Sequence, residues 1–238
     1  MVFALAWEAA GRFLTGLYAF PPLSAIFAEA IRVFSTGAIY PHVAVSFLEL
    51  FGGFLAAAVL GIVLGIAIGV SERASDYFLP LVYAINATPI VALAPLLIVV
   101  MGIGILSKVV VIFLLCYFSI LINTVAGMRN VDEALVEAAQ AFGASRRQVI
   151  QKVLLPNARS FIVAGLRVAL GRGLVGVVVA ELYGSRAGLG WLIWYASEQM
   201  NTSLLFVSVL ILAIAGIISV VALDQLEKRL APWRKVRL

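Results

Sequence analysis

The sequence has few charged residues and almost no cysteine or histidine. Of its 238 residues, 12% are charged and 63% are hydrophobic, whereas soluble domains carry about 25% charged residues. A soluble domain of this length could not bury so much apolar surface, because its surface is too large for its volume. The composition therefore excludes an ordinary cytosolic enzyme, a disordered chain and a nucleic-acid-binding domain. We expect a membrane protein with no nucleic acid partner.

The residues that most often perform catalysis or bind metals are scarce. Cys116 is the single cysteine, which excludes a disulfide framework and a multi-thiolate metal site. Its place in an uncharged run predicts a small buried hydrophobe. His42 is the single histidine, so it has no second histidine with which to share a metal, and we expect it at a membrane interface. The sequence has no G-x-x-x-x-G-K-[ST] loop, G-x-S-x-G or H-E-x-x-H motif, so we expect no catalytic site, metal or cofactor in this chain.

Long uncharged runs are what the sequence does have. A membrane core about 30 Å thick is crossed by about 20 helical residues. Uncharged runs of such length are 50–70, 77–107, 109–128 and 203–223, and 160–180 is apolar apart from two arginines. We predict an all-α membrane helix bundle with five spans, at about residues 45–70, 79–101, 105–128, 160–182 and 203–223. Prolines 80, 89 and 95 are expected to kink the second span.

The N-terminal region, residues 1–42, does not fit this pattern. The uncharged run 13–28 is short and is interrupted by Pro21 and Pro22, which disfavour a continuous helix. We expect a short or interfacial helix before Pro21 and another from about Ser24 to Phe34. No signal peptide is predicted, because the start lacks a basic region and a small-residue cleavage site. The membrane domain is then 43–230, and 231–238 is a basic tail.

The distribution of basic residues predicts the orientation. Lysine and arginine gather in 129–159 and after Asp224, and 71–78 adds Arg73, whereas the opposite loops hold only Lys108 and Arg186. Loops rich in lysine and arginine stay in the cytoplasm. We therefore predict a multi-pass protein of the cell (inner) membrane with 71–78, 129–159 and the C-terminus in the cytoplasm.

Two glycine patterns have structural interpretations. Residues 171–176 match G-x-G-x-x-G, but a dinucleotide site needs a preceding strand, and this run lies in a predicted span. We interpret it as small residues that let helices approach closely. Gly61, Gly65 and Gly69 share one helix face and predict a close helix–helix contact. The sequence leaves open whether the partner helix is in the same chain.

The segment 130–156, between two predicted spans, has a different composition. Asp132 is a predicted N-cap, Gly143 a left-handed helix stop, and Ser145 with Gln148 a capping box. The second helix is expected to end by Pro156. A simple amphipathic connector is one interpretation of this segment. A rigid pair of capped helices on the cytoplasmic face instead suggests a docking platform.

Residues of this segment resemble the EAA motif of permease subunits of ATP-binding-cassette importers. The match consists of Glu137, Ala138, Ala139, Gly143, Leu155 and Pro156, with Val153 where the motif has isoleucine. Over about residues 40–230 the chain is similar to type I importers with a methionine-permease-like five-helix core. Residues 87–90, 121–124, 177–181 and 188–190 are similar to the nitrate, taurine and aliphatic-sulfonate permease group. The N-terminus departs from that group, whose members have a full first span.

The resemblance implies partners and a function. The EAA residues would insert into a groove on a separate ATPase subunit, which binds ATP and Mg²⁺, and Glu137 would pair with a basic group there. Further partners would be a periplasmic or lipid-anchored solute-binding protein, membrane lipid and a second copy of this chain. The solute would be small and anionic, such as a sulfonate, taurine, nitrate or bicarbonate. A thiamine precursor, ion-coupled secondary transport and a non-transport scaffold are the alternatives.

Polar side chains within spans are costly in free energy and tend to face a path or a partner. We expect Arg167 to extend toward the cytoplasmic end, and Arg172 to face the bundle interior, either in the path or in an ion pair. Glu181 lies near the outer end, where it could bond backbone groups. The candidates for the translocation path are Asn86, Thr88, Asn123, Arg167, Arg172 and Glu181. Ser119 is a further polar candidate.

Overall fold

The structure is a computed structural model that describes residues 2–13 and 20–230. All regular structure in these residues is helical. The predicted basic tail 231–238 lies outside the described residues. The elements, in chain order, are α1 (Val2–Phe13), α2 (Leu23–Ser35), α3 (Tyr40–Gly69), α4 (Glu72–Ala87), α5 (Ile90–Met101), α6 (Ile105–Arg129), α7 (Glu133–Ala141), α8 (Arg146–Val149), the π-helical turn η1 (Ile150–Leu154), α9 (Leu155–Gly184), α10 (Leu189–Glu198) and α11 (Thr202–Leu230).

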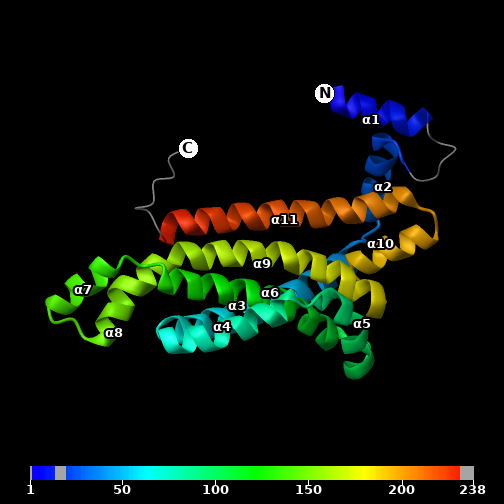
Figure 1. Cartoon of the computed structure of the whole chain (residues 1–238). Helices are drawn as coiled ribbons and strands as arrows, with labels where there is room; N and C mark the ends of the chain where they lie inside the picture. The colour runs from blue at the N-terminus through cyan, green and yellow to red at the C-terminus, as the bar shows by residue number, and fades with distance from the viewer. Residues whose placement is uncertain (1, 14–19, 231–238) are drawn as a thin grey trace.

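The bundle is built on long helices that run along one direction. Figure 1 shows α3, α6, α9 and α11 side by side, with α7 and α8 at one end and α10 at the other. Within the described residues, four helices are long and apolar enough to cross a membrane, or five if α4 and α5 together form one span. The four are Tyr40–Gly69, Ile105–Arg129, Arg146–Gly184 and Thr202–Gln225.

Glycines bring α3 and α6 into close contact. A Cβ atom at Gly65 would lie 2.6 Å from the Cβ atom of Thr124, and one at Gly69 would lie 2.6 Å from that of Met128. Gly61 faces Ile120 in the same way. The partner helix left open by the sequence is therefore α6 of the same chain, and the prediction of close packing is confirmed.

The core lies between α3, α6 and α9. Cys116 is fully buried among apolar side chains of these helices and donates its Sγ–H to the Ala169 carbonyl oxygen at 3.2 Å. The prediction of a small buried hydrophobe is confirmed. A second apolar cluster joins α2 to α10 and α11, and includes Ile26, Val33, Leu189 and Leu204.

Helices form on both sides of the proline pair in the N-terminal region, as predicted. Trp7 of α1 donates its indole N–H to the Pro21 carbonyl oxygen at 3.1 Å and packs edge-on against Phe206 of α11. In Figure 1, α1 and α2 lie at the end of the bundle opposite α7 and α8.

The predicted kink in the span over about 79–101 is confirmed, and it is a sharp break. The chain forms two helices, α4 and α5, that are bent by 82° with Thr88 and Pro89 between them. Thr88 is extended, with ψ at 134°, because a residue before proline is pushed away from the helical conformation. Pro80 and Pro95 lie inside α4 and α5. The break therefore occurs at Pro89.

Candidate functional site

The segment between α6 and α9 begins with a well-capped helix. The Asp132 side chain accepts a hydrogen bond from the Ala134 N–H at 3.0 Å, which confirms the predicted N-cap of α7. Gly143 ends the helix with φ at +79°, and the Ala144 N–H donates to the Ala139 carbonyl oxygen at 3.0 Å. This is the left-handed helix stop that the glycine predicts.

The second helix of the segment starts as predicted but does not end as predicted. Ser145 and Gln148 form the expected capping box. The prediction that the helix ends by Pro156 is wrong, because Arg146–Gly184 is one continuous helix of 39 residues. In the π turn η1, the Leu155 N–H donates to the Ile150 carbonyl oxygen, five residues back. This wider turn makes room for the Pro156 ring, which in an α-helix would meet the carbonyl of residue 152.

The two helices enclose an open groove at the end of the bundle, hereafter the coupling groove. Its volume is about 290 Å³. Three of the motif residues line the groove, namely Ala139, Gly143 and Val153. Phe142 is 93% exposed beside it, and no residue of α7 is buried. Motif residues and an exposed apolar side chain therefore meet at one open groove.

The other motif residues surround the coupling groove. Glu137 and Ala138 are exposed on α7, and Glu137 has no ion-pair partner within the part of the chain that the structure describes. Leu155 and Pro156 are half-buried at the start of α9. The structure therefore brings Ala139, Gly143 and Val153 together and leaves Glu137 free on the outside.

Bonds near the coupling groove tie it to the bundle. Arg129 of α6 forms an ion pair of 2.9 Å with Asp76 of α4. The Asn157 side chain donates to the Asn130 carbonyl oxygen at 2.9 Å. Residues 71–78 and 129–159 therefore lie at the same end of the bundle, as the predicted topology requires.

Three of the path candidates meet at the break between α4 and α5. A guanidinium N–H of Arg172 donates to the Asn86 side-chain oxygen at 3.1 Å. Asn86, Thr88 and Arg172 line one pocket of about 320 Å³, hereafter the kink pocket. The expectation that Arg172 faces the interior of the bundle is wrong for the single chain, because the residue is exposed. Its partner is an amide and not a carboxylate, so its charge is uncompensated in the kink pocket.

The remaining path candidates lie elsewhere. The Asn123 side chain donates to the Ser119 carbonyl oxygen of its own helix at 2.8 Å and packs against Gly165. Arg167 forms ion pairs with Asp224 and Glu227 of α11, with 3.0 Å to the latter. Neither side chain lines the kink pocket.

Glu181 belongs to a buried network at the opposite end from the coupling groove. It accepts hydrogen bonds from the Gly190 N–H and the Ser46 hydroxyl, each at 2.6 Å. Ser46 in turn accepts from the Leu189 N–H at 2.7 Å, and the His42 Nδ1 atom accepts from the Gly188 N–H at 3.1 Å. These side chains satisfy the first N–H groups of α10. Glu181 therefore bonds a backbone group, as expected, and fixes α10 to α3 and α9.

Sequence reasoning missed the second half of this network. Glu49 of α3 and Lys108 of α6 are both buried and form an ion pair. Charged residues are almost never fully buried unless they are paired. Glu49 is the one acid in the run 43–70 and Lys108 the one base near the start of α6, so these two residues could have indicated a buried ion pair.

Comparison with known proteins identifies the family. Residues 57–236 match the binding-protein-dependent transport system inner membrane component family. The chain belongs to this family. It is 33% identical over 200 residues to the taurine transport system permease protein of Escherichia coli (strain K12), which covers 84% of this chain and 73% of that relative. It is 30% identical over 229 residues to the formylaminopyrimidine transport permease protein of Halalkalibacterium halodurans, and this match covers 96% of this chain and 91% of that relative.

A solved structure supports the fold of this family member. A chain of the inward-facing methionine ABC transporter matches with a TM-score of 0.65 and 21% identity, over 81% of this chain and 94% of that chain. The predicted all-α, methionine-permease-like bundle is confirmed. The resemblance to the importer permeases is confirmed as well.

Proposed function

We propose that this chain is the permease subunit of an ATP-binding-cassette importer for a small anionic solute. The observation that carries the proposal is the coupling groove, which three residues of the EAA motif line. It is exposed at one end of the bundle, and α9 runs from it toward the kink pocket. A push on the groove by a partner would therefore reach the path along one continuous helix. Such rigid-body movement is one way in which packed bundles switch between states.

The coupling groove fits a partner that inserts apolar and charged side chains together. Phe142 and Leu135 are exposed at 93% and 57%, and Glu137 offers a carboxylate for a basic group on the partner. The partner would be an ATPase subunit that binds ATP and Mg²⁺, with the groove and the C-terminus on the cytoplasmic side. This assignment agrees with the positive charge of residues 129–159. A solute-binding protein would deliver the solute at the opposite end.

The kink pocket supports an anionic solute. The Arg172 guanidinium has an uncompensated charge, and it keeps donors for a solute after its bond to Asn86. Ile90 and Val91 of α5 line the pocket, and the same helix exposes the apolar residues Leu96, Val99 and Val100. A second copy of the chain would enclose the pocket between the two subunits and cover that surface. The proposed assembly is therefore a homodimer with two ATPase subunits.

Uptake into membrane vesicles tests this proposal. Right-side-out vesicles that contain the chain, its ATPase and its binding protein are given radiolabelled taurine, an alkanesulfonate, nitrate, bicarbonate or a formylaminopyrimidine, with and without ATP inside. We expect ATP-dependent uptake of at least one of the first four solutes, each of which carries an oxyanion group, and uptake that persists when proton and sodium gradients are dissipated. Uptake of a formylaminopyrimidine in place of any anion would contradict the anionic solute. Uptake that needs only an ion gradient would contradict the importer.

A further inference from the structure

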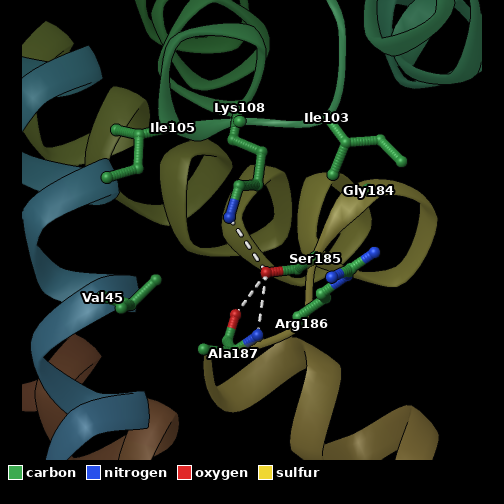
Figure 2. A pocket seen from close by; sticks show the side chains of 9 residues that line it. Val45, Ile103, Ile105, Lys108, Gly184, Ser185, Arg186 and Ala187 are labelled. Atoms are coloured by element: carbon green, nitrogen blue, oxygen red, sulfur yellow. Dashed lines mark hydrogen bonds between the residues drawn. The ribbon is translucent and has the colours of Figure 1, made fainter.

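A pocket of about 420 Å³ lies at the end of the bundle opposite the coupling groove. Its walls are the start of α3, the turn between α5 and α6, and the turn between α9 and α10. Figure 2 shows Lys108 reaching from above toward Ser185, with Arg186 and Ala187 on the same turn. We call it the outer pocket. It is separate from the kink pocket, because the two share no lining residue.

Lys108 holds one wall of the outer pocket in place. Its side chain is 5% exposed, forms an ion pair with Glu49 and donates to the Ser185 hydroxyl at 2.9 Å. Ser185 donates to the Ala187 carbonyl oxygen, and its oxygen accepts from the Ala187 N–H at 3.3 Å. The turn that carries Arg186 is thereby fixed to α6. Glu49 compensates the charge of Lys108, so Lys108 acts here as a positioning residue.

Arg186 supplies the uncompensated charge of the outer pocket. It lines the pocket, is exposed, and has no hydrogen-bond or ion-pair partner within residues 2–13 and 20–230. The carboxylates nearby are already engaged, Glu49 with Lys108 and Glu181 with Ser46 and Gly190. The guanidinium presents up to five N–H donors in a planar fork, which suits the paired oxygens of an oxyanion.

The start of α6 adds to the positive potential. Gly104 is the N-cap of this 25-residue helix, it lines the outer pocket, and no side chain caps the helix there. The first N–H groups of a helix and its dipole attract negative charge. A Cβ atom at Gly104 would have nothing within 4 Å, so the space in front of the helix start is open.

We propose that the outer pocket is an oxyanion subsite, which takes the sulfonate or carboxylate group of a solute before the solute reaches the kink pocket. The Arg186 guanidinium binds the oxyanion, Lys108 positions the turn, and the start of α6 contributes its N–H groups. This inference rests on the proposed function, since it assigns a first binding point to the same anionic solute. The second cationic point along the path is then Arg172.

Charge-selective labelling tests the outer pocket in the full complex. Ala187→Cys places a thiol on the pocket wall, and Ile103→Cys places one on a residue that is 72% exposed on the opposite wall. Cells are labelled from outside with two methanethiosulfonate reagents, the anionic sulfonatoethyl and the cationic trimethylammonioethyl compound. The unsubstituted chain gives the background from buried Cys116. Ala38→Cys, an exposed position just before α3, is the control outside the pocket.

For each position we compare the labelling rate of the sulfonate reagent with that of the cationic reagent. This ratio of rates is expected to be about tenfold higher at residue 187 than at residue 38, because a cationic cleft concentrates anions. Arg186→Gln should remove most of this preference, and Arg186→Lys should keep part of it. A ratio within twofold of the control, or a preference unchanged by Arg186→Gln, would overturn the proposal. Absence of labelling by either reagent at both 187 and 103 would also overturn it, because the pocket would then be closed to the outside.

The failure of this inference is distinguishable from the failure of the proposed function. Labelling needs neither ATP nor transport, whereas uptake into vesicles needs both. Intact ATP-dependent anion uptake without charge-selective labelling leaves the importer and removes the outer subsite. In uptake assays, Arg186→Gln should raise KM several-fold and leave the maximal rate nearly unchanged. A fall in the maximal rate with an unchanged KM would assign Arg186 a role in the conformational cycle in place of solute capture.

Discussion

Gly143 adopts a backbone conformation that other residues reach only with strain. Its φ is +79°, and a Cβ atom there would have nothing within 4 Å. The constraint on this position is therefore the backbone angle and not crowding. A side chain in the left-handed region costs about 1–2 kcal/mol, and the angle between α7 and α8 would change to relieve it.

Gly143→Val is expected to reduce ATP-dependent uptake several-fold while the chain still reaches the membrane. Ala141→Val is the matched control, because residue 141 is exposed at the end of α7 and lies in the helical region. Uptake and the amount of chain in the membrane are measured for both variants. Unchanged uptake by Gly143→Val would show that the angle between the helices does not matter for coupling.

Arg172 is the cation that we assign to the kink pocket. Arg172→Gln removes its charge, and loss of a charged hydrogen bond costs about 1.5–3 kcal/mol, which corresponds to a KM for anion uptake that is higher by about tenfold or more. Arg172→Lys should lose less. The KM of Arg167→Gln should stay close to that of the unsubstituted chain, because Arg167 is bound to Asp224 and Glu227 of α11. Equal KM values for Arg172→Gln and the unsubstituted chain would remove Arg172 from the path.

The buried Glu181 is a stability residue in this account. Glu181→Ala leaves the Gly190 N–H and the Ser46 hydroxyl without their acceptor, and each unsatisfied buried group costs about 1–3 kcal/mol. We expect the Tm of the detergent-solubilised complex to fall by several degrees. Glu198→Ala, at an exposed position on the same side of the bundle, should leave the Tm unchanged. Equal Tm values for the two variants would contradict the role of the network.

At the scale of elements, the close contact between α3 and α6 depends on glycine. Gly65→Ala would place a Cβ atom 2.6 Å from the Cβ atom of Thr124, and overpacking of this kind costs about 1–3 kcal/mol. Gly52→Ala is the control on the same helix, because its nearest neighbour, a Val109 methyl group, would lie at 3.4 Å. Thermal unfolding should separate the two variants by several degrees. Similar unfolding of both would show that the helices move apart without cost.

Local signals explain what could be predicted about the elements. Asp132, Gly143 and Ser145 act through neighbours in the chain, so the capped start and stop of α7 and the start of α8 follow from the sequence. Prolines 80, 89 and 95 likewise predict a kink in the second span, but they do not single out Pro89 or give the angle of 82°. The π turn before Pro156 replaces the helix end that this proline predicts. The pair between Glu49 and Lys108 joins residues far apart in the chain. Spacing alone therefore could not predict the angle of the bend, the π turn or this ion pair.

At the scale of the whole molecule, the two ends of the bundle have different chemistry. One end carries the coupling groove and exposed basic residues, and the other carries the buried Glu49–Lys108 pair, the Glu181 network and the outer pocket. The kink pocket lies at the break between α4 and α5, and Arg172 and Val175 of α9 also line it. In the proposed homodimer, the second copy of the chain would supply the other wall of that pocket.

The membrane complex is accordingly expected to contain two copies of this chain. Native mass spectrometry of the complex released from mild detergent gives the count directly, because each copy contributes 25.4 kDa. Two copies together with two ATPase subunits agree with the account. One copy together with a different permease chain would show that a related subunit supplies the second wall, and one copy alone would contradict an enclosed path.

The central claim is that the coupling groove binds an ATPase, and co-purification from native membranes tests it most directly. The tagged chain is purified in mild detergent, and the accompanying proteins are identified by mass spectrometry. We expect an ATPase with a phosphate-binding loop, which is retained by Ala141→Val and lost when Glu137→Ala and Gly143→Val are combined. An ATPase that stays bound to the double variant, or none under several detergents, would contradict it.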